Sequence, residues 1–352
     1  MTGTVASAVP AGDGPAVEVR DLRIGATRRG RAAGDDEIVH GVSFTIEAGR
    51  CVALVGESGA GKSITARALL GLSGDGTAVT AQTLRVLGDD VLGYSAAQWR
   101  RLRGGRAGLI LQDALTSLDP LQTVHSAISE VLRQHGTVPR SRVDARVVEL
   151  LELVGIADAA ERSRQRPGQL SGGLRQRALI ATAIAADPGL IVADEPTTAL
   201  DVTVQQQVLD LLGAIRAADG VALVLISHDV TVVGEVCDRV LVMYAGRVVE
   251  EVTAAGLATR AQHPYTRALV AAVPDMDTDV DAPLATIAGR PVDPADVPPG
   301  CPYAARCPLA DDRCRAEDPP LAASPTGRVA CWRAGEPLTL GPTRTDDLVE
   351  TT

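Results

Sequence analysis

Lysine is almost absent from this chain, because Lys62 is the only lysine among its 34 basic residues. Aromatic residues make up 2% of the sequence, and acidic residues outnumber basic ones by 44 to 34. Nucleic-acid-binding proteins usually carry a basic surface, and those that bind single strands use aromatic side chains for stacking. The composition therefore argues against a nucleic-acid partner.

Long apolar runs are also missing, and Val221–Ile226 is typical of the longest ones. A membrane-spanning helix needs about 20 apolar residues. The first residues carry no basic cluster of the kind that opens a secretory signal, so we expect a protein that stays in the reducing cytoplasm. In that compartment the six cysteines are poor disulfide candidates and better candidates for metal or cluster ligands.

The 352 residues, with 45% hydrophobic and 22% charged residues, have a globular composition. Short β-rich runs alternate with helical stretches, which predicts an α/β domain with a largely parallel sheet over residues 15–258. From Pro274 onward proline is frequent, and four cysteines fall between 301 and 331. We therefore predict a small loop-rich module over 259–340, with flexible tails at 1–14 and 341–352. Expected strands are Val17–Val19, Cys51–Val55, Leu109–Leu111, Leu190–Ala193, Ala222–Ile226 and Val240–Met243; expected helices are Ser63–Leu70, Arg142–Val154, Leu174–Ala186, Val204–Ala217 and Val230–Val236.

The one lysine lies in a phosphate-binding motif, G-x-x-x-x-G-K-[ST], between an expected strand and an expected helix. Glycines allow backbone N–H groups to surround a phosphate without Cβ clashes. The compact ammonium of Lys62 fits between β- and γ-phosphates better than a planar guanidinium does, and the Ser63 hydroxyl suits Mg²⁺. The predicted nucleotide-binding residues are Gly56, Glu57, Ser58, Gly59, Ala60, Gly61, Lys62 and Ser63.

Two further segments carry polar groups suited to nucleotide chemistry. Asp194 and Glu195 follow an apolar strand, where one carboxylate can hold Mg²⁺ and the other can polarise an attacking water. Ser171, Gly172 and Gly173 open a helix whose N-terminus can bind an anion. A single triphosphate does not need two anion-binding helix N-termini within one domain. Two copies of the domain facing head to tail would use both N-termini, and each copy would complete the nucleotide site of the other.

These segments, in this order, resemble the nucleotide-binding subunits of ABC transporters. Residues 50–63 are similar to Walker A, 170–177 to the signature motif and 190–196 to Walker B. Gln112 is in the position of the Q-loop glutamine, and Ala199–Asp201 and Ser227–Asp229 resemble the D-loop and the switch region. The expected fold is an α/β P-loop ATPase domain of this family, with a mixed or parallel sheet and a helical signature subdomain.

The resemblance implies Mg-ATP hydrolysis at a composite interface. The implied catalytic residues are Glu195 as the general base, His228 in contact with the γ-phosphate, and Gln112. Ser63, Gln112 and Asp194 would serve Mg²⁺ and its water shell. Ser171, Gly172, Gly173 and Asp201 would reach nucleotide held across the interface with a partner subunit.

The runs Gln112–Pro120, His263–Leu269 and Gly300–Trp332 resemble those of the dipeptide, oligopeptide and nickel importers. The implied protein energises peptide uptake at the cytoplasmic face of the membrane, with nickel or another metal chelate as the alternative cargo. The implied partners are a homologous second ATPase subunit, two transmembrane permeases that contact the Gln112–Pro120 loop, and a solute-binding protein. A homodimer stays open. An ABC ATPase acting on nucleic acid is disfavoured, because the chain has neither a second cassette nor a coiled-coil insertion, and the intact Glu195 and His228 argue against a degenerate regulatory cassette.

Cys301, Cys307, Cys314 and Cys331 form the most distinctive feature of the C-terminal module. From ligand chemistry alone, zinc, an iron–sulfur cluster and reduced structural thiols all stay open, because the spacing lacks C-x₂-C. The resemblance favours a [4Fe–4S] cluster at these four positions, with a structural role. The sequence departs from the family near the N-terminus, where Ile24–Thr27 replaces the aromatic residue that usually stacks on adenine.

Overall fold

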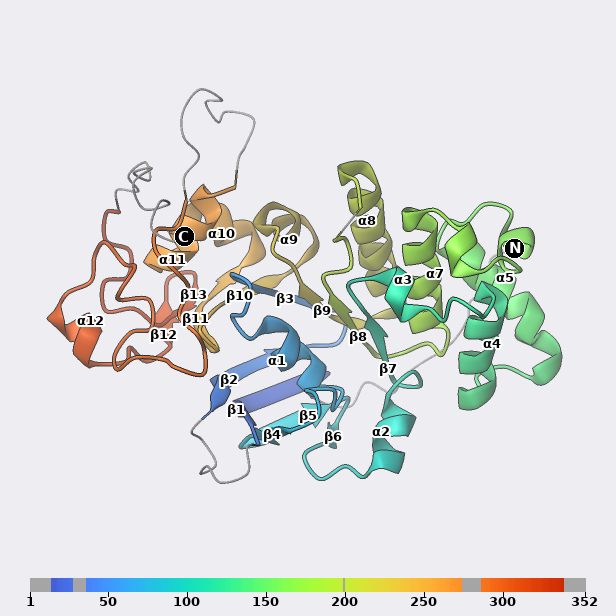
Figure 1. Cartoon of the computed structure of the whole chain (residues 1–352), viewed down its shortest axis with the longest axis horizontal. Coiled ribbons are helices and arrows are strands. Elements are labelled where there is room, and N and C mark those ends of the chain that lie inside the picture. Colours follow the sequence, from blue (N-terminus) through green and yellow to red (C-terminus); the bar gives the residue numbers. More distant parts are fainter. Residues whose placement is uncertain (1–13, 28–35, 199, 274–285, 339–352) are drawn as a thin grey trace, which may run out of the picture.

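The computed structural model of the chain describes residues 14–27, 36–198, 200–273 and 286–338. An eight-stranded sheet runs through its centre, with strand order β12-β13-β11-β10-β3-β9-β8-β7. Figure 1 shows helices on both sides of this sheet. The strands are β3 (Cys51–Val55), β7 (Ala107–Ile110), β8 (Leu190–Asp194), β9 (Ala222–Ile226), β10 (Arg239–Tyr244), β11 (Arg247–Thr253), β12 (Ala322–Ser324) and β13 (Gly327–Val329).

The five strands from β10 to β7 pair in parallel, as the sequence predicts. Every residue of β3, β8 and β9 is buried, because strands covered by helices on both faces have no solvent side. Parallel strands end at the same edge, so the segments after β3, β7, β8 and β9 lie together. This edge brings the predicted phosphate loop close to the predicted carboxylates.

A second, antiparallel sheet with order β2-β1-β5-β6, to which β4 adds through β1, was not anticipated from the sequence. Its longest strands alternate between buried and more exposed positions, so they present no continuous apolar run. Phe44 is 3% exposed in the core between this sheet and the central one, as expected of a core strand residue. The strands are β1 (Val17–Ala26), β2 (Glu37–Ile46), β4 (Thr77–Thr80), β5 (Thr83–Val86) and β6 (Asp89–Asp90).

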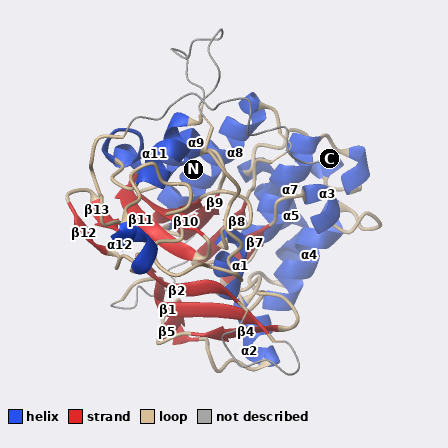
Figure 2. Ribbon diagram, turned by 60° about the vertical axis from the view of Figure 1, so that its left-hand side comes forward, coloured by secondary structure: helices blue, strands red, loops and turns tan. Residues whose placement is uncertain are grey.

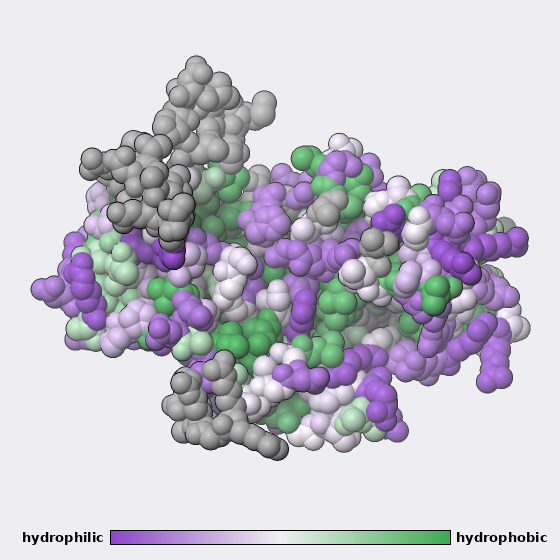
Figure 3. All heavy atoms as spheres, in the orientation of Figure 1, coloured by the Kyte–Doolittle hydropathy of each residue, from purple (hydrophilic) through white to green (hydrophobic). Residues whose placement is uncertain are grey.

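A helical layer flanks β7, at the edge of the central sheet opposite β12 (Figure 2). Its helices α4 (Val124–His135), α5 (Val143–Leu153), α7 (Gly172–Ile184) and α8 (Val202–Asp219) share one apolar core with β8 and β9. Figure 3 shows hydrophilic side chains covering the outer end of this layer, as expected for amphipathic helices. The other helices are α1 (Lys62–Ala68), α2 (Ala96–Leu102), α3 (Ala114–Ser117), α6 (Ala159–Arg162), α9 (Val230–Val236), α10 (Leu257–Arg260), α11 (Pro264–Ala271) and α12 (Asp312–Ala316).

The described part of the C-terminal module, residues 259–273 and 286–338, extends the central sheet, because β13 pairs antiparallel with β11. The carboxylate of Glu251 on β11 is 8% exposed and forms ion pairs with Arg239 on β10 and Arg328 on β13. Module and central sheet thus share a buried electrostatic contact. The division at residue 258 stays a proposal, and of the predicted tails only Gly14 lies within the described residues.

Within the described part of the chain, no helix has the length and apolarity that crossing a membrane requires.

His263 anchors helix α11 from inside the protein. It is 1% exposed, and its Nδ1 accepts a hydrogen bond of 3.0 Å from the Tyr265 backbone N–H, as the N-cap of the helix. The backbone N–H of His263 donates to the Glu250 carboxylate at 3.0 Å. Burial lowers the pKa of His263 to about 3, so the imidazole is neutral in the folded protein at neutral pH.

Stability should therefore fall with acidification. Unfolded His263 takes up a proton below pH about 6.5 and the folded residue does not, which costs up to about 1.4 kcal/mol per pH unit below that value. His263→Asn keeps an N-cap acceptor and removes this proton. Urea unfolding followed by circular dichroism from pH 7 to pH 5 should give a shallower loss of stability for the variant. Glu250 is present in both proteins, so its contribution to the pH dependence cancels in the comparison. An equal loss of stability with falling pH in the two proteins would contradict the assignment.

Candidate active site

The predicted phosphate loop, residues 56–63, connects β3 to α1 and surrounds one buried ammonium group. Lys62 is 6% exposed and donates to the backbone carbonyls of Gly56 at 2.8 Å and Glu57 at 2.9 Å. Burial lowers the pKa of Lys62, while the charges of Glu195, Asp194 and Glu57 oppose that shift. The ammonium therefore lies inside the loop, with Ser58 and Gly59 exposed at its tip.

Gly56 fixes the base of the loop through a close backbone contact. Its φ is 144°, and a Cβ at this position would lie 2.2 Å from the carbonyl oxygen of Met243. A Cβ on Gly59 would have no atom within 4 Å. Gly56 is thus required by packing against β10, whereas Gly59 borders open space where a phosphate can approach.

Asp194 ends β8 and connects it to α1. The residue is 1% exposed, its Oδ1 accepts from Ser63 Oγ at 2.8 Å, and its Oδ2 accepts from Arg67 Nε at 2.8 Å. A carboxylate beside a hydroxyl is an oxygen donor set that suits Mg²⁺. The sequence predicted Ser63 and Asp194 for this role, and it gave no indication of Arg67.

Glu195 is the point on which the predicted catalytic side chains converge. Its Oε2 accepts from Gln112 Nε2 at 3.0 Å and from Thr198 Oγ1 at 3.1 Å, and His228 Nδ1 lies 3.7 Å away. Glu195 has a φ of 48°, a left-handed conformation that is uncommon for a non-glycine residue and clusters at functional sites. The structure therefore places all three predicted catalytic residues together. Thr198 was missed, because nothing in its sequence context distinguishes it.

Ser171, Gly172 and Gly173 lie at the start of α7 in the helical layer. Ser171 is the N-cap residue, and Ser171 and Gly172 are exposed. Asp201 is the exposed N-cap of α8, where its Oδ1 accepts from the Val204 N–H at 3.0 Å. Ser171 is thus accessible from outside its own fold. Ala199 of the predicted D-loop lies outside the described residues.

The segment in the position of the usual adenine-stacking residue, Ile24–Thr27, forms the end of β1 and the residue after it. Ile24 is fully buried within β1, so it packs in the core and is not available for stacking. Residues 28–35 lie outside the described part of the chain.

The four cysteines of the C-terminal module do not fit a metal site as they are placed. They are close enough to influence one another electrostatically, and the Cys301 N–H donates to the Cys314 carbonyl at 2.8 Å. However, the described residues contain no group of three or more Cys, His, Asp or Glu side chains arranged to hold a metal. Burial raises the pKa of all four thiols, which favours the neutral form over the thiolate that a metal requires. The predicted [4Fe–4S] cluster, and zinc as its alternative, are therefore not supported.

Gly56 and Gly168 offer a matched test of the loop geometry. Gly56→Ala should lower the free energy of unfolding by about 2–4 kcal/mol, because the new Cβ would meet the Met243 carbonyl in a strained conformation. Gly168→Ala adds a Cβ in open space and should have little effect. Chemical denaturation of both variants measures the difference, and equal stabilities would show that the contact with Met243 does not constrain the loop.

The chain is similar to two known protein families and to solved ATP-binding cassettes. The family described as ABC transporter matches residues 39–198, and the family described as Oligopeptide/dipeptide transporter, C-terminal region, matches residues 249–314. The dimeric ATP-binding cassette MJ0796, solved in a post-hydrolysis state with ADP and Pi, aligns with a TM-score of 0.59 and 24% identity. That alignment covers 68% of this chain and 98% of the cassette, and it bears on the fold alone.

Curated relatives cover most of this chain. A probable peptide ABC transporter ATP-binding protein, y4tR of Sinorhizobium fredii, is 42% identical over 85% of this chain and 90% of its own length. The dipeptide transport ATP-binding protein DppD of Escherichia coli is 43% identical over 82% and 88%. The oligopeptide transport ATP-binding protein AppD of Bacillus subtilis is 41% identical over 84% and 90%. The predictions of fold and family are confirmed: the chain belongs to the ABC transporter ATPases that carry the oligopeptide/dipeptide transporter C-terminal region.

Proposed function

We propose that this chain hydrolyses ATP to power the uptake of dipeptides or oligopeptides through a membrane transporter. The convergence of Gln112 and His228 on Glu195, next to the buried Asp194, is the observation that carries the proposal. The peptide cargo rests on the names of the relatives. Those names give no support to nickel, so we do not carry the alternative cargo forward.

In this proposal the loop binds the phosphates of ATP. Lys62 exchanges its bonds to the Gly56 and Glu57 carbonyls for phosphate oxygens, and backbone N–H groups of residues 58–63 surround the β-phosphate. Ser63 Oγ and Asp194 Oδ1 lie 2.8 Å apart, and these two residues would hold Mg²⁺ together with Gln112. When bound, Mg²⁺ neutralises the charge that develops on the phosphates.

Hydrolysis then requires a base for the attacking water. Glu195 accepts the water proton as the oxygen attacks the γ-phosphorus, the bond to ADP breaks, and phosphate leaves. The hydrogen bonds from Gln112 and Thr198 orient the Glu195 carboxylate before the reaction. His228 has a side chain that is 66% exposed, so it is free to contact the γ-phosphate from the open side.

The second half of each site would come from a partner cassette. Ser171 and Gly172 are exposed at the start of α7, and Asp201 caps α8 on the exposed surface. We propose that two cassettes face head to tail, so that this serine and its glycines close over ATP bound by the partner. A homologous second ATPase subunit is the favoured partner, and a homodimer uses the same geometry.

The contact with the permease is proposed at the end of the Gln112–Pro120 loop. Leu121 is 78% exposed there, although it is a large apolar residue. Beside it is a groove of about 580 Å³ lined by Pro120, Thr123, Arg164, Arg166, Gly168 and Gln169. An exposed apolar side chain beside a groove with two arginines is a surface that can bind a short amphipathic helix. Two permeases at the cytoplasmic face of the membrane, supplied by a solute-binding protein, complete the proposed transporter.

The cysteine site has no step in this mechanism. A [4Fe–4S] cluster stays a hypothesis drawn from the sequence resemblance, and zinc stays one drawn from ligand chemistry. Iron, sulfide and zinc content of anaerobically purified protein tests it: four iron atoms per chain would support the cluster, and metal-free protein would reject both.

The catalytic role is tested by Glu195→Gln, which keeps the shape of the side chain and removes the base. The turnover number should fall by about 10²–10⁴-fold, with ATP affinity retained. Phosphate release by the assembled transporter and equilibrium ATP binding give the two readouts. Glu152→Gln, on the exposed surface of α5, makes the same chemical change away from the site and should hydrolyse ATP normally. Wild-type turnover by Glu195→Gln would refute the assignment.

The shared site is tested by Ser171→Arg, which introduces a bulky cation where the partner's nucleotide would lie. ATP binding to the isolated chain should be unchanged, while ATPase activity of the assembled transporter should fall by about 100-fold or more. Ser95→Arg is the matched control, because Ser95 is also an exposed serine N-cap, on α2. Equal activity of the two variants would exclude a composite site.

A further inference from the structure

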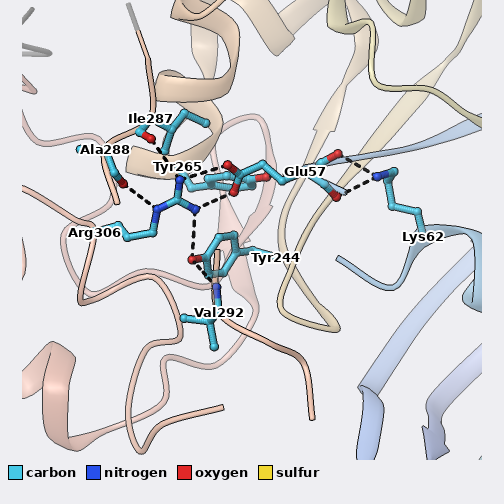
Figure 4. A network of polar contacts seen from close by, with 9 residues as sticks. Glu57, Lys62, Tyr244, Tyr265, Ile287, Ala288, Val292 and Arg306 are labelled. Carbon is cyan, nitrogen blue, oxygen red and sulfur yellow. Dashed lines mark hydrogen bonds and ion pairs between the residues drawn. The ribbon is translucent and has the colours of Figure 1, made fainter. Parts of the chain in front are cut away.

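Glu57 lies inside the phosphate loop, yet its side chain turns away from Lys62 and toward the C-terminal module (Figure 4). Its two carboxylate oxygens accept hydrogen bonds from the Arg306 guanidinium, at 2.6 Å and 3.0 Å. The Arg306 side chain is only 3% exposed. A partly buried, bidentate ion pair therefore connects residues separated by 249 positions in the sequence.

The surroundings of Arg306 hold the guanidinium in one position. Its Nε donates to the Ala288 carbonyl at 2.7 Å, and one terminal nitrogen also donates to the Ile287 carbonyl at 3.2 Å. The other terminal nitrogen also donates to Tyr244 Oη at 3.3 Å. With the two bonds to Glu57, every N–H of the group has an acceptor. Arg306 is thus held by two carbonyls of the module and by Tyr244 of β10, in addition to its contact with the loop.

The module also holds the backbone of the same loop residue. The Glu57 N–H donates to Tyr265 Oη at 2.8 Å, and Tyr265 is fully buried on α11. The Tyr265 ring packs against Tyr244 and Tyr303, with centroids 4.8 Å and 5.3 Å away. Side chain and main chain of Glu57 are therefore both positioned by residues outside the phosphate loop.

This arrangement offsets an unfavourable charge within the loop, the carboxylate of Glu57. The Glu57 carbonyl accepts from Lys62, so the Glu57 carboxylate belongs to a residue in direct contact with the ammonium that must bind phosphate. A free carboxylate at that place would repel the triphosphate and compete with it for the ammonium. Pairing with Arg306 neutralises this charge and directs it away from the ligand.

We propose that Arg306 and Tyr265 are positioning residues that keep Glu57 out of the phosphate site, so that the C-terminal module sets the affinity of the loop for ATP. The inference rests on the proposed ATP-binding function. It assigns the module a direct effect on nucleotide affinity and leaves the chemistry at Glu195 unaffected. ATP affinity and KM should therefore respond to these residues, and kcat at saturating ATP should not.

Arg306→Gln provides the main test, with ATP binding by the full-length chain measured by equilibrium dialysis. The dissociation constant should rise by about tenfold or more, because the Glu57 charge is no longer compensated. Adding Glu57→Gln to the same chain removes that charge and should restore affinity to within about threefold of wild type. Tyr265→Phe deletes only the hydroxyl and should give a smaller rise, which provides a second measurement if Arg306→Gln does not fold.

Asp318→Asn is the matched control. Asp318 pairs with Arg247 of β11, so it also connects module and central sheet through an arginine–carboxylate contact, away from Glu57. This variant should bind ATP as the wild type does. An equal loss in Asp318→Asn, no loss in Arg306→Gln, or failure of Glu57→Gln to restore binding would each overturn the proposal.

Failure of this inference is distinguishable from failure of the proposed function. If the wild type binds ATP and Lys62→Ala does not, the phosphate site stands, whatever Arg306→Gln shows. If the wild type does not bind ATP, both the function and the inference are wrong.

Discussion

The buried ammonium of Lys62 is the contact around which the site is organised. It is the only lysine in the chain, and it binds two carbonyls of its own loop while three carboxylates act on it electrostatically. A compact cation in that position needs a loop that bends tightly around it, and Gly56 provides the bend against the Met243 carbonyl. The same cation needs counter-charges nearby, which the ends of neighbouring strands supply.

The parallel order of the central sheet makes those counter-charges available. β8 lies between β7 and β9, and β9 lies beside β3. The residues that follow these strands, Gln112, Asp194, Glu195 and His228, therefore reach one edge although they are far apart in the sequence. Glu195 has a strained backbone conformation at this edge and is held there by Gln112 from another segment and by Thr198, three residues further along its own segment. The chemistry proposed here depends on that topology more than on any single motif.

The C-terminal module is an integral part of this arrangement. It adds β13 to the central sheet, shares the buried Glu251 with it, and contacts the phosphate loop through Arg306 and Tyr265. Of its cysteines, which dominate the sequence pattern, Cys301 and Cys314 lie in an apolar core shared with the central sheet, and Cys307 packs against it. Its less conspicuous residues make the contacts nearest to the proposed ATP site.

The sequence alone determined the phosphate loop, the paired carboxylates, the buried strands and the family, because these depend on residue types at fixed local spacing. Continuous apolar runs such as Ala222–Ile226 identify buried strands directly, whereas the half-buried strands of the antiparallel sheet carry no such run. Of that sheet, only the Val17–Val19 part of β1 was among the expected strands. Only the tertiary structure decided that Thr198 and Arg67 join the site, that Glu57 pairs with Arg306, and that the four cysteines lie near one another without forming a ligand group. The contact of Thr198 depends on the local backbone turn at Glu195. The contacts of Arg67 and Glu57 join segments far apart in the chain, so they are set by how the sheets and the module pack.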